Sequence, residues 1–453
     1  HRDHPGLSLL LTLLFLAWHA AAANGEAKDL QDAARQGDTR TVLRLLSSAA
    51  DADSTDLLGN RVLILAASGG HTATVKALLK RGVQINAVDR DGRSALILAS
   101  ANGHTDVVEL LLAHRAMPDT ADKAGMTALH WSAMRARPAV ATALVRQGAD
   151  VNVRDNAGIS PLLFSVAKRD AETVQLLASH GADLEVIDPQ SDMTPLLLAV
   201  EQEDITSVRV LLERGADANH ADSKQISPLM LAAGKPQTGL VAALLEYGAD
   251  ANAHSQDGQT ALMFASTAGQ VEAARILLAK GARINATDKR GTSALMLAAQ
   301  SGSLELVEAL LAAGAAIEHR DTRGFTALTG AAWVRQIDVV ETLLEHGADA
   351  NTRDVNNRTA LMWAALRGYL KITVLLQAHG ANVNARDRQG MTAMMWAASK
   401  GQAATVRQLL DAGADPGLEN SAGQTAATLA EKNRHKAIVE ILESHRSANA
   451  PSQ

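Results

Sequence analysis

One pattern dominates this sequence: the short motif G-x-[ST]-[AP]-L returns every 33 residues along most of the chain. Its first position is held in turn by Gly59, Gly92, Gly125, Gly158, Asp192, Gln225, Gly258, Gly291, Gly324, Asn357, Gly390 and Gly423. The spacing changes only once, by a single inserted residue in DPQSD at 188–192. A fixed period of this length indicates small units that bury their apolar faces against one another. We therefore expect a linear stack of similar layers.

Each repeat predicts the same series of local structures. A turn such as DRDG (89–92) comes first, because Gly can adopt the positive φ that the turn needs. A Ser or Thr that can cap a helix follows, as at Ser94, Thr127, Thr260 and Thr326. A short helix (261–269, for example) leads to a second helix with an apolar stripe, as in Val107, Val108, Leu111 and Leu112 or Val339, Val340, Leu343 and Leu344. The repeat closes with GADxN, whose Gly ends the second helix.

The composition fits such a stack and excludes several kinds of chemistry. Hydrophobic residues make up 47% of the 453 residues but aromatic residues only 2%, which suits many small layers better than one large core. The net charge of −6 offers no general attraction to nucleic acid, so no nucleic-acid partner is expected. The chain has no cysteine, which rules out disulfides, thiolate catalysis and cysteine metal sites.

These features resemble the ankyrin repeat, a 33-residue unit of a β-turn and two antiparallel helices. The resemblance covers roughly residues 26 to 445. It implies an all-α repeat solenoid, elongated and curved, with the turn tips and first helices on its concave face. The chain departs from the family pattern in the first helix, where the usual His survives only at His130, and apolar packing is expected to replace it elsewhere. The glycine between the two helices is also replaced, by Ala136, Arg169, Glu203 and Pro236. We interpret these as divergent turns, the alternative being a bend of the solenoid in this segment.

The expected domain organisation follows from the repeat boundaries. A single solenoid should span 24–446, with an N-terminal cap (26–55), about eleven full repeats (56–419) and a C-terminal cap (420–446). The caps are more polar because their outer faces meet water. A disordered tail (447–453) should follow, and we expect the solenoid to be monomeric.

The first 23 residues differ from the rest. The apolar run LSLLLTLLFLAW (7–18) precedes an Ala-rich stretch, which is typical of a secretory signal peptide at 1–23, cleaved after Ala22 or Ala23. An uncleaved membrane anchor is the alternative, but a helix over 7–23 would be roughly 26 Å long, just short of a bilayer core. We expect an exported protein, secreted or periplasmic, from a Gram-negative bacterium, because the lack of cysteine fits a periplasm better than a disulfide-rich extracellular setting.

No catalytic residues, cofactor or metal ligands are predicted. Motifs for metalloproteases, nucleotide-binding loops and serine hydrolases are absent. Three of the fifteen histidines lie in the first 23 residues, and the histidines that recur do so because the repeat recurs, as does the Asp that opens each turn. His71 and His104 occupy the turn between helices, and His114, His180, His346 and His379 fall near helix ends, where a positive charge favours the helix dipole. We interpret the turn-opening Asp residues as acceptors of backbone hydrogen bonds.

The surface is the remaining candidate for function. In the family, partners contact the turn tips and the exposed positions that follow the Ala-Ala of the first helix. Carried over to this chain, these positions predict a protein-binding set: Arg90, Arg93, Lys289, Arg290, Arg323, Phe325, Trp333, Arg358, Arg367, Arg388 and Met391. Arg with Phe, Met and Trp is the composition favoured at interface hot spots. Trp333 with Phe325 is the strongest signal, because a large ring at an exposed position needs a cover.

Trp363 and Trp396 belong to near-identical stretches, TALMWAA and TAMMWAA. They share a position with Leu98, Leu198, Leu231, Leu297, Trp131, Phe164 and Phe264, whereas Gly330 holds it one repeat before Trp363. We interpret both rings as inter-repeat core rather than as a binding box.

The leading functional hypothesis is a non-enzymatic scaffold that binds a protein partner after export. One alternative is an envelope organiser tethered to the membrane, which depends on an uncleaved N-terminus. A second is an enzyme or metal-binding protein that uses scattered His and Asp side chains on the concave face.

Overall fold

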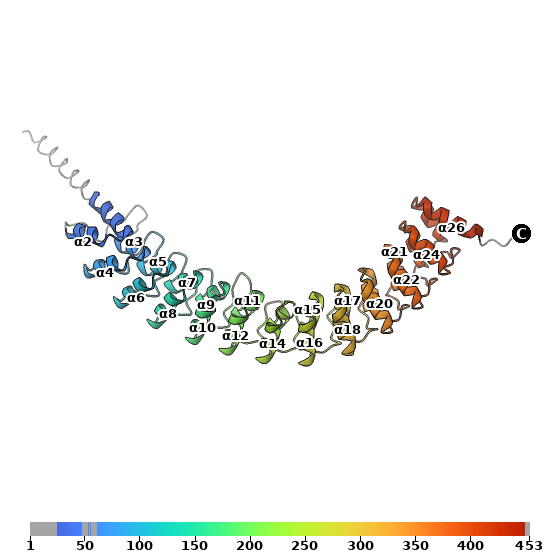
Figure 1. Ribbon diagram of the computed structural model, residues 1–453, viewed down its shortest axis with the longest axis horizontal. Coiled ribbons are helices and arrows are strands. Elements are labelled where there is room, and N and C mark those ends of the chain that lie inside the picture. The colour runs from blue at the N-terminus through green and yellow to red at the C-terminus, as the bar shows by residue number, and fades with distance from the viewer. Residues whose placement is uncertain (1–24, 48–52, 54, 56–60, 449–453) are drawn as a thin grey trace, which may run out of the picture. The chain divides into compact units, whose positions relative to one another are not determined.

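The computed structural model describes residues 25–47, 53, 55 and 61–448. The chain forms two compact units, His1–Asp222 (unit 1) and Ser223–Gln453 (unit 2). Within each unit, the first helices of the repeats form one row and the second helices form another (Figure 1). In the described part of the chain, extended pairs occur only as isolated bridges such as Val88 with Ser94. The prediction of an all-α repeat solenoid is confirmed.

Unit 1 begins with a helical segment at 25–36 and α2 (Thr39–Ser47). Its first helices are α3 (Val62–Ser68), α5 (Ala95–Asn102), α7 (Ala128–Met134), α9 (Pro161–Ala167) and α11 (Pro195–Glu201). Its second helices are α4 (Thr72–Lys80), α6 (Thr105–Ala113), α8 (Pro138–Arg146), α10 (Ala171–Ser179) and α12 (Ile205–Glu213).

In unit 2 the first helices are α13 (Pro228–Ala233), α15 (Ala261–Ala268), α17 (Ala294–Ser301), α19 (Ala327–Trp333), α21 (Ala360–Arg367), α23 (Ala393–Ser399) and α25 (Ala426–Lys432). The second helices are α14 (Thr238–Glu246), α16 (Val271–Ala279), α18 (Leu304–Ala312), α20 (Ile337–Glu345), α22 (Leu370–Ala378), α24 (Ala403–Asp411) and α26 (Lys436–Ala448). The expected signal peptide (1–23) and residues 449–453 of the expected tail lie outside the described residues. None of the helices in the described ranges combines the length and the apolar character that crossing a bilayer requires.

The first helices begin where the Ser and Thr positions predicted them. The hydroxyl oxygens of Ser94, Thr127 and Thr326 accept hydrogen bonds from the backbone N–H three residues later. Such caps satisfy one of the free donors at a helix start. Thr260 was expected to do the same, but its hydroxyl makes no capping bond. The boundary of α15 therefore rests on the turn before it rather than on a side-chain cap.

The second helices carry the apolar stripe that their spacing predicted. Val107, Val108, Leu111 and Leu112 of α6 are all buried, as are the four equivalent residues of α20. The ends of these helices are closed by His114, His180, His346 and His379, whose Nδ1 atoms donate to the carbonyl oxygen four residues earlier at 2.8 to 3.0 Å. These histidines lie at the helix ends, as their repeat position predicted, and their rings make hydrogen bonds to the last helical turn.

The divergent turns between helices keep their shape at an energetic cost. Ala136, Arg169 and Glu203 replace the usual Gly and adopt φ of 50°, 55° and 58°. Residues with a β-carbon reach this left-handed region only at a cost of roughly 1–2 kcal/mol. At these three turns the substitution changes the local strain and leaves the helix–turn–helix path intact, as expected for divergence.

Polar side chains join successive layers on the side of the GADxN turns. The Nδ2 of Asn351 donates to the carbonyl oxygen of Gly380 (3.0 Å), and its Oδ1 accepts from the backbone N–H of Asn382 (2.8 Å). Asn152 and Asn252 make the same pair of bonds. Because each bond reaches only the next layer, contacts within a unit link neighbouring layers.

His130 is the one fully buried histidine of the first helices, in keeping with its survival there. Its Nε2 donates to the carbonyl oxygen of Ile159 (3.1 Å), and its Nδ1 accepts from the backbone N–H of Thr127 (3.2 Å). This pairing fits the neutral ring. Burial lowers the pKa of His130 below its usual value, although the hydrogen bond to Ile159 opposes the shift.

Replacing His130 by Met is expected to reduce the pH dependence of stability. Because the folded pKa lies below the unfolded one, the unfolded chain binds more protons, and stability falls as the pH drops through the ordinary histidine pKa of 6.5. A Met side chain binds no proton in this pH range, and Met already fills the same repeat position at Met230 and Met296. The free energy of unfolding, measured with urea at about pH 7.5 and at about pH 5.5, should therefore change less with pH in His130→Met than in the wild type. The slopes of the two proteins should differ by up to about 1.4 kcal/mol per pH unit. Equal slopes in both proteins would contradict this assignment.

Candidate functional site

The Asp that opens each turn organises the backbone of the turn tip. In Asp321, Oδ1 accepts from the backbone N–H of Arg323 (2.9 Å) and Phe325 (2.8 Å). Asp89, Asp288, Asp354 and Asp387 make the same two bonds to the residues two and four positions later. The interpretation of these carboxylates as turn acceptors is confirmed, and it leaves only their second oxygens for other work.

In unit 2 the turn tips are tied to one another. The backbone N–H of Lys289 donates to Asp257 O, that of Thr322 to Arg290 O, and that of Val355 to Arg323 O, at 2.8, 2.8 and 2.9 Å. The series continues from Arg388 to Asn356 O and from Ser421 to Gln389 O. The tips therefore form one continuous ladder, in which the side chains of successive layers are held at the spacing of the layers.

A group of stacked cations and rings lies on the first helices and turn tips of unit 2. Arg323 lies over Phe325 at 4.5 Å, Arg367 lies over Trp333 at 4.0 Å, and the rings of Trp333 and Trp363 meet edge-on at 4.7 Å. Arg358 lies between two rings, 4.8 Å from Trp363 and 5.0 Å from Trp396. We call these seven residues (Arg323, Phe325, Trp333, Arg358, Trp363, Arg367 and Trp396) the Arg–aromatic cluster.

The repeat explains how the cluster forms. Phe325, Arg358 and Met391 share the position after the turn glycine, and Gly330, Trp363 and Trp396 share a position five residues later. Arg358 reaches the ring of its own layer and the ring of the next. In the preceding layer the ring position is Gly330, so Phe325 contacts the ring of the next layer instead, with its centre 5.7 Å from that of Trp363. The residue types at these two repeat positions thus determine which neighbouring layers the cluster connects.

The indole N–H groups show that Trp363 differs from its counterparts. Trp131 Nε1 donates to Asp122 (2.9 Å), and Trp396 Nε1 donates to Asp387 (3.1 Å), in each case to the Asp nine residues earlier. Trp363 has Asp354 at the same distance along the chain, yet its buried Nε1 has no hydrogen-bond partner in the described structure. Its ring instead packs edge-on against Trp333. The contact between the two rings therefore replaces a hydrogen bond that the repeat would otherwise supply.

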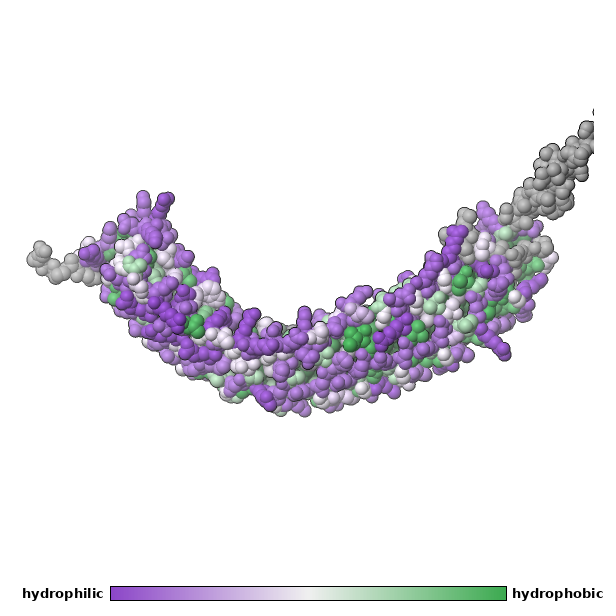
Figure 2. All heavy atoms as spheres, turned by 180° about the vertical axis from the view of Figure 1, so that it is seen from behind, coloured by the Kyte–Doolittle hydropathy of each residue, from purple (hydrophilic) through white to green (hydrophobic). Residues whose placement is uncertain are grey.

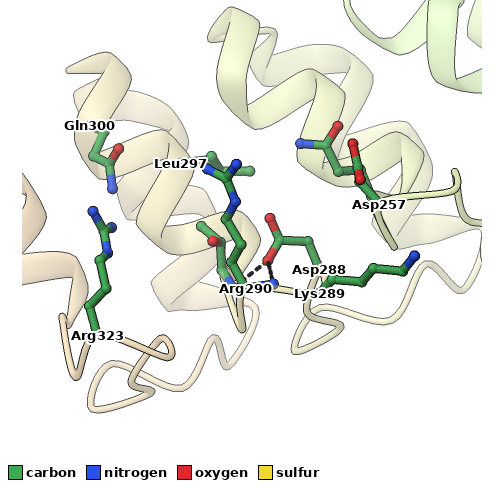
Figure 3. A pocket seen from close by; sticks show the side chains of 9 residues that line it. Asp257, Asp288, Lys289, Arg290, Leu297, Gln300 and Arg323 are labelled. Carbon is green, nitrogen blue, oxygen red and sulfur yellow. Dashed lines mark hydrogen bonds between the residues drawn. The ribbon is translucent and has the colours of Figure 1, made fainter. Parts of the chain in front are cut away.

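A hollow of about 370 Å³ adjoins the cluster. It is lined by Asp257, Gln259, Asp288, Lys289, Arg290, Thr292, Leu297, Gln300 and Arg323. Figure 3 shows Arg323 directed toward Gln300 and Arg290 lying beside Leu297, with Asp257 and Lys289 on the other side. At Gly330 a β-carbon would lie 3.1 Å from Nε2 of Gln300, which lines the hollow. The hollow is polar and carries three cations.

The structure places the predicted residues in two units. Arg90 and Arg93 lie in unit 1, where Arg93 is held by Asp89 (2.9 Å) and Asp91 (2.8 Å). The other nine lie in unit 2. Five of these (Arg323, Phe325, Trp333, Arg358 and Arg367) belong to the Arg–aromatic cluster, while Lys289 and Arg290 line the hollow. Arg388 is exposed at the next turn tip.

Met391 was predicted at the surface, and this prediction is wrong. The side chain is only 6% exposed, and its sulfur accepts a hydrogen bond from Asn420 Nδ2 (3.3 Å). The position after the turn glycine faces the next layer, so an unbranched apolar side chain packs there rather than outward. At the same position Met126 is also buried, whereas Met193, Phe325 and Arg358 remain partly accessible.

The assignment of Trp363 and Trp396 to the core is also wrong in part. Both rings are partly exposed, as are Leu98, Trp131 and Leu297 at the equivalent position. Trp333, expected to be exposed, is partly buried and covered by the guanidinium of Arg367. All three rings therefore belong to one surface. An Arg at the position of Arg358, with a Trp five residues later and another in the next repeat, is the signal that sequence reasoning missed.

No group of three or more His, Asp or Glu side chains among the described residues is arranged to hold a metal ion. On the face shown in Figure 2, hydrophilic residues cover most of the described surface, and hydrophobic residues appear as separate small groups. The Arg–aromatic cluster, with its rings and ordered cations, is the arrangement best suited to contact another molecule.

A family model described as ankyrin repeats in three copies matches residues 30–122, 82–155, 129–222, 196–288, 283–354 and 350–420. The matches overlap and together run without a break from residue 30 to residue 420. No curated protein matches the chain.

Proposed function

The chain belongs to the ankyrin-repeat family, and on that premise we propose that it is a non-enzymatic scaffold whose unit 2 binds a protein partner through the Arg–aromatic cluster. Ankyrin repeats are generally protein–protein interaction modules, and proteins built from them are typically scaffolds rather than enzymes. The repeat packing accounts for the buried residues, and the turn tips and first helices carry side chains that differ between layers.

One observation carries the proposal: three Arg side chains are stacked on four partly exposed rings across neighbouring layers. Trp and Arg dominate the energetics of protein interfaces. Long side chains lose rotamer freedom when a partner binds, at a cost of roughly 0.5–1.5 kcal/mol each. Stacking has already restricted Arg358 and Arg367, so this surface is partly organised for a partner.

We place this activity after export, as a monomer in the periplasm or outside the cell. The support is the apolar, Ala-rich stretch at 1–23, which is typical of a signal peptide. A mature chain that begins near Ala23 or Asn24 would support this location. Recovery of the intact N-terminus in a membrane fraction would instead favour an organiser of the envelope.

Affinity capture with the mature chain tests the binding surface. The wild-type protein should retain a partner in stoichiometric amount, and Trp333→Ala combined with Arg323→Ala should lose it, because both residues belong to the cluster. Trp131→Leu is the control: it removes from unit 1 a ring at the repeat position of Trp363, where Leu98 and Leu198 already hold that position. Unchanged capture by the double variant, with an unchanged helical CD spectrum, would refute the site.

A further inference from the structure

We infer that the partner presents an extended acidic segment to the Arg–aromatic cluster, with prolines and with a carboxylate at every third residue. This inference rests on the proposed function, because it names the chemistry of the segment that unit 2 would bind. Three observations support it: the separation of charge within unit 2, the spacing of its cations and the nature of its rings.

Charge is separated between the two rows of helices in unit 2. The turn tips and first helices of the layers from 288 to 400 carry the cations Lys289, Arg290, Arg323, Arg358, Arg367, Arg388 and Lys400. The second helices of the same layers carry the exposed acids Glu305, Glu308, Asp338, Glu341 and Glu345, and one exposed cation, Lys371. The carboxylates of Asp321, Asp354 and Asp387 do lie at the tips, but they are buried and bonded to the backbone, whereas that of Asp288 is partly exposed.

Several of these cations have no carboxylate of their own. No ion pair occurs for Lys289, Arg290, Arg367, Arg388 or Lys400 among the residues that the structure describes. Arg367 contacts the ring of Trp333, which leaves the edge of its guanidinium available for a carboxylate. An Arg held in this way can take a carboxylate in a two-bonded arrangement. The chain has a net charge of −6, so this cationic surface runs against its overall sign.

The layer spacing selects the form of the acidic segment. Arg290, Arg323, Arg358 and Arg388 come from four successive turn tips, whose backbones the ladder joins, although they hold different positions within the turn. Arg323 and Arg358 also face the buried carboxylates of Asp321 and Asp387. Neighbouring packed helices lie about 8–10 Å apart. A polyproline II chain rises about 3.1 Å per residue with three residues per turn, so every third side chain returns to the same face after about 9 Å. Carboxylates at every third residue would therefore each meet one layer.

The rings favour proline between the carboxylates. Proline-rich segments dock on aromatic surfaces in an extended form that costs little entropy. Phe325, Trp333, Trp363 and Trp396 are all partly exposed and alternate with the Arg side chains. A segment of this kind can place its apolar residues on the rings while its carboxylates face the cations.

The test uses a labelled synthetic peptide of repeated Glu-Pro-Ala units, roughly 15 residues long, which would extend over about 46 Å. Fluorescence anisotropy with the mature chain should show binding that weakens as salt is raised. A peptide of the same composition and length, with its glutamates alternately two and four residues apart, should bind at least about tenfold more weakly, because half of its carboxylates then face away.

Variants of the protein separate this surface from general attraction. Arg290→Gln with Arg388→Gln should weaken the binding of the regular peptide about tenfold or more. Lys371→Gln with Arg407→Gln removes two exposed cations from the second helices of the same unit and should have little effect. Equal affinity for the two peptides, equal losses in the two double variants, or no peptide binding would overturn the inference. Partner capture that still depends on Trp333 and Arg323 would leave the proposed function standing in each of these cases.

Discussion

Replacing Asp387 by Ala is expected to destabilise unit 2 by about 3–5 kcal/mol. This carboxylate is 6% exposed and serves three neighbours at once. Its Oδ1 accepts from the backbone N–H of Gln389 (2.8 Å) and Met391 (2.9 Å), and its Oδ2 accepts from Trp396 Nε1 (3.1 Å). Arg358 Nε lies 3.7 Å from the same Oδ2. Removal of the carboxylate leaves buried donors and a cation without a partner, which a urea unfolding curve of unit 2 should register as a lower midpoint.

Asp387→Asn provides the matched comparison. Asn420 occupies the same position in the next layer, and its Oδ1 accepts from the backbone N–H of Ala422 (3.0 Å) and Gln424 (2.9 Å). An amide can therefore hold the turn, but its NH₂ group faces the N–H of Trp396 and cannot accept from it. We expect a loss of about 1–2 kcal/mol for this variant. If Ala and Asn were equally destabilising, the turn hydrogen bonds would not be the main contribution of Asp387.

The second large effect is expected at Gly324, where Ala should destabilise unit 2 by about 2–4 kcal/mol. Its φ is 78°, and a β-carbon would lie 2.9 Å from Val355 N and 3.0 Å from Asp354 Cα. Val355 N donates to Arg323 O in the tip ladder, so the clash falls on a bond between layers. Asn357 holds the same position one turn later with φ of 59°, which indicates the backbone adjustment that a β-carbon requires.

Gly347→Ala separates the two causes of this loss. Gly347 has a similar φ of 86°, but a β-carbon there would have nothing within 4 Å. Gly347→Ala should therefore lose about 1–2 kcal/mol of stability, which is the cost of the left-handed conformation alone. The difference in unfolding free energy between the two alanine variants, measured with urea, then gives the energetic cost of the steric clash between layers. A larger loss at Gly347 than at Gly324 would contradict the role given to the tip ladder.

The architecture could be predicted from the sequence because each local signal is repeated many times. The stripe of Val107, Val108, Leu111 and Leu112, the Ser94 cap and the turn-opening Asp89 all behave as their spacing indicated. A failure at one repeat does not alter the fold, because neighbouring layers impose it. Thr260 does not cap its helix, and Ala136 adopts positive φ without a glycine, yet both helices form where they were expected.

The candidate site could be predicted only in part, because it depends on contacts between layers. The turn tips were correctly chosen as a surface, and Trp333 with Phe325 marked the right layer. The burial of Met391 and the partial exposure of Trp363 depend on how far each side chain reaches toward the next repeat. Spacing within one repeat gives no measure of that reach. The stacking of Arg358 between two rings, 33 residues apart in sequence, follows only from the packed layers.

The restriction of contacts to neighbouring layers also gives each unit a mechanical property. When the ends of such a stack are pulled, the outermost layer can detach without loosening those further inside, because its bonds reach only one layer inward. Each detached layer would release 33 residues, which extend to roughly 110–120 Å. A solenoid of this kind can lengthen in steps under load while its remaining layers stay folded.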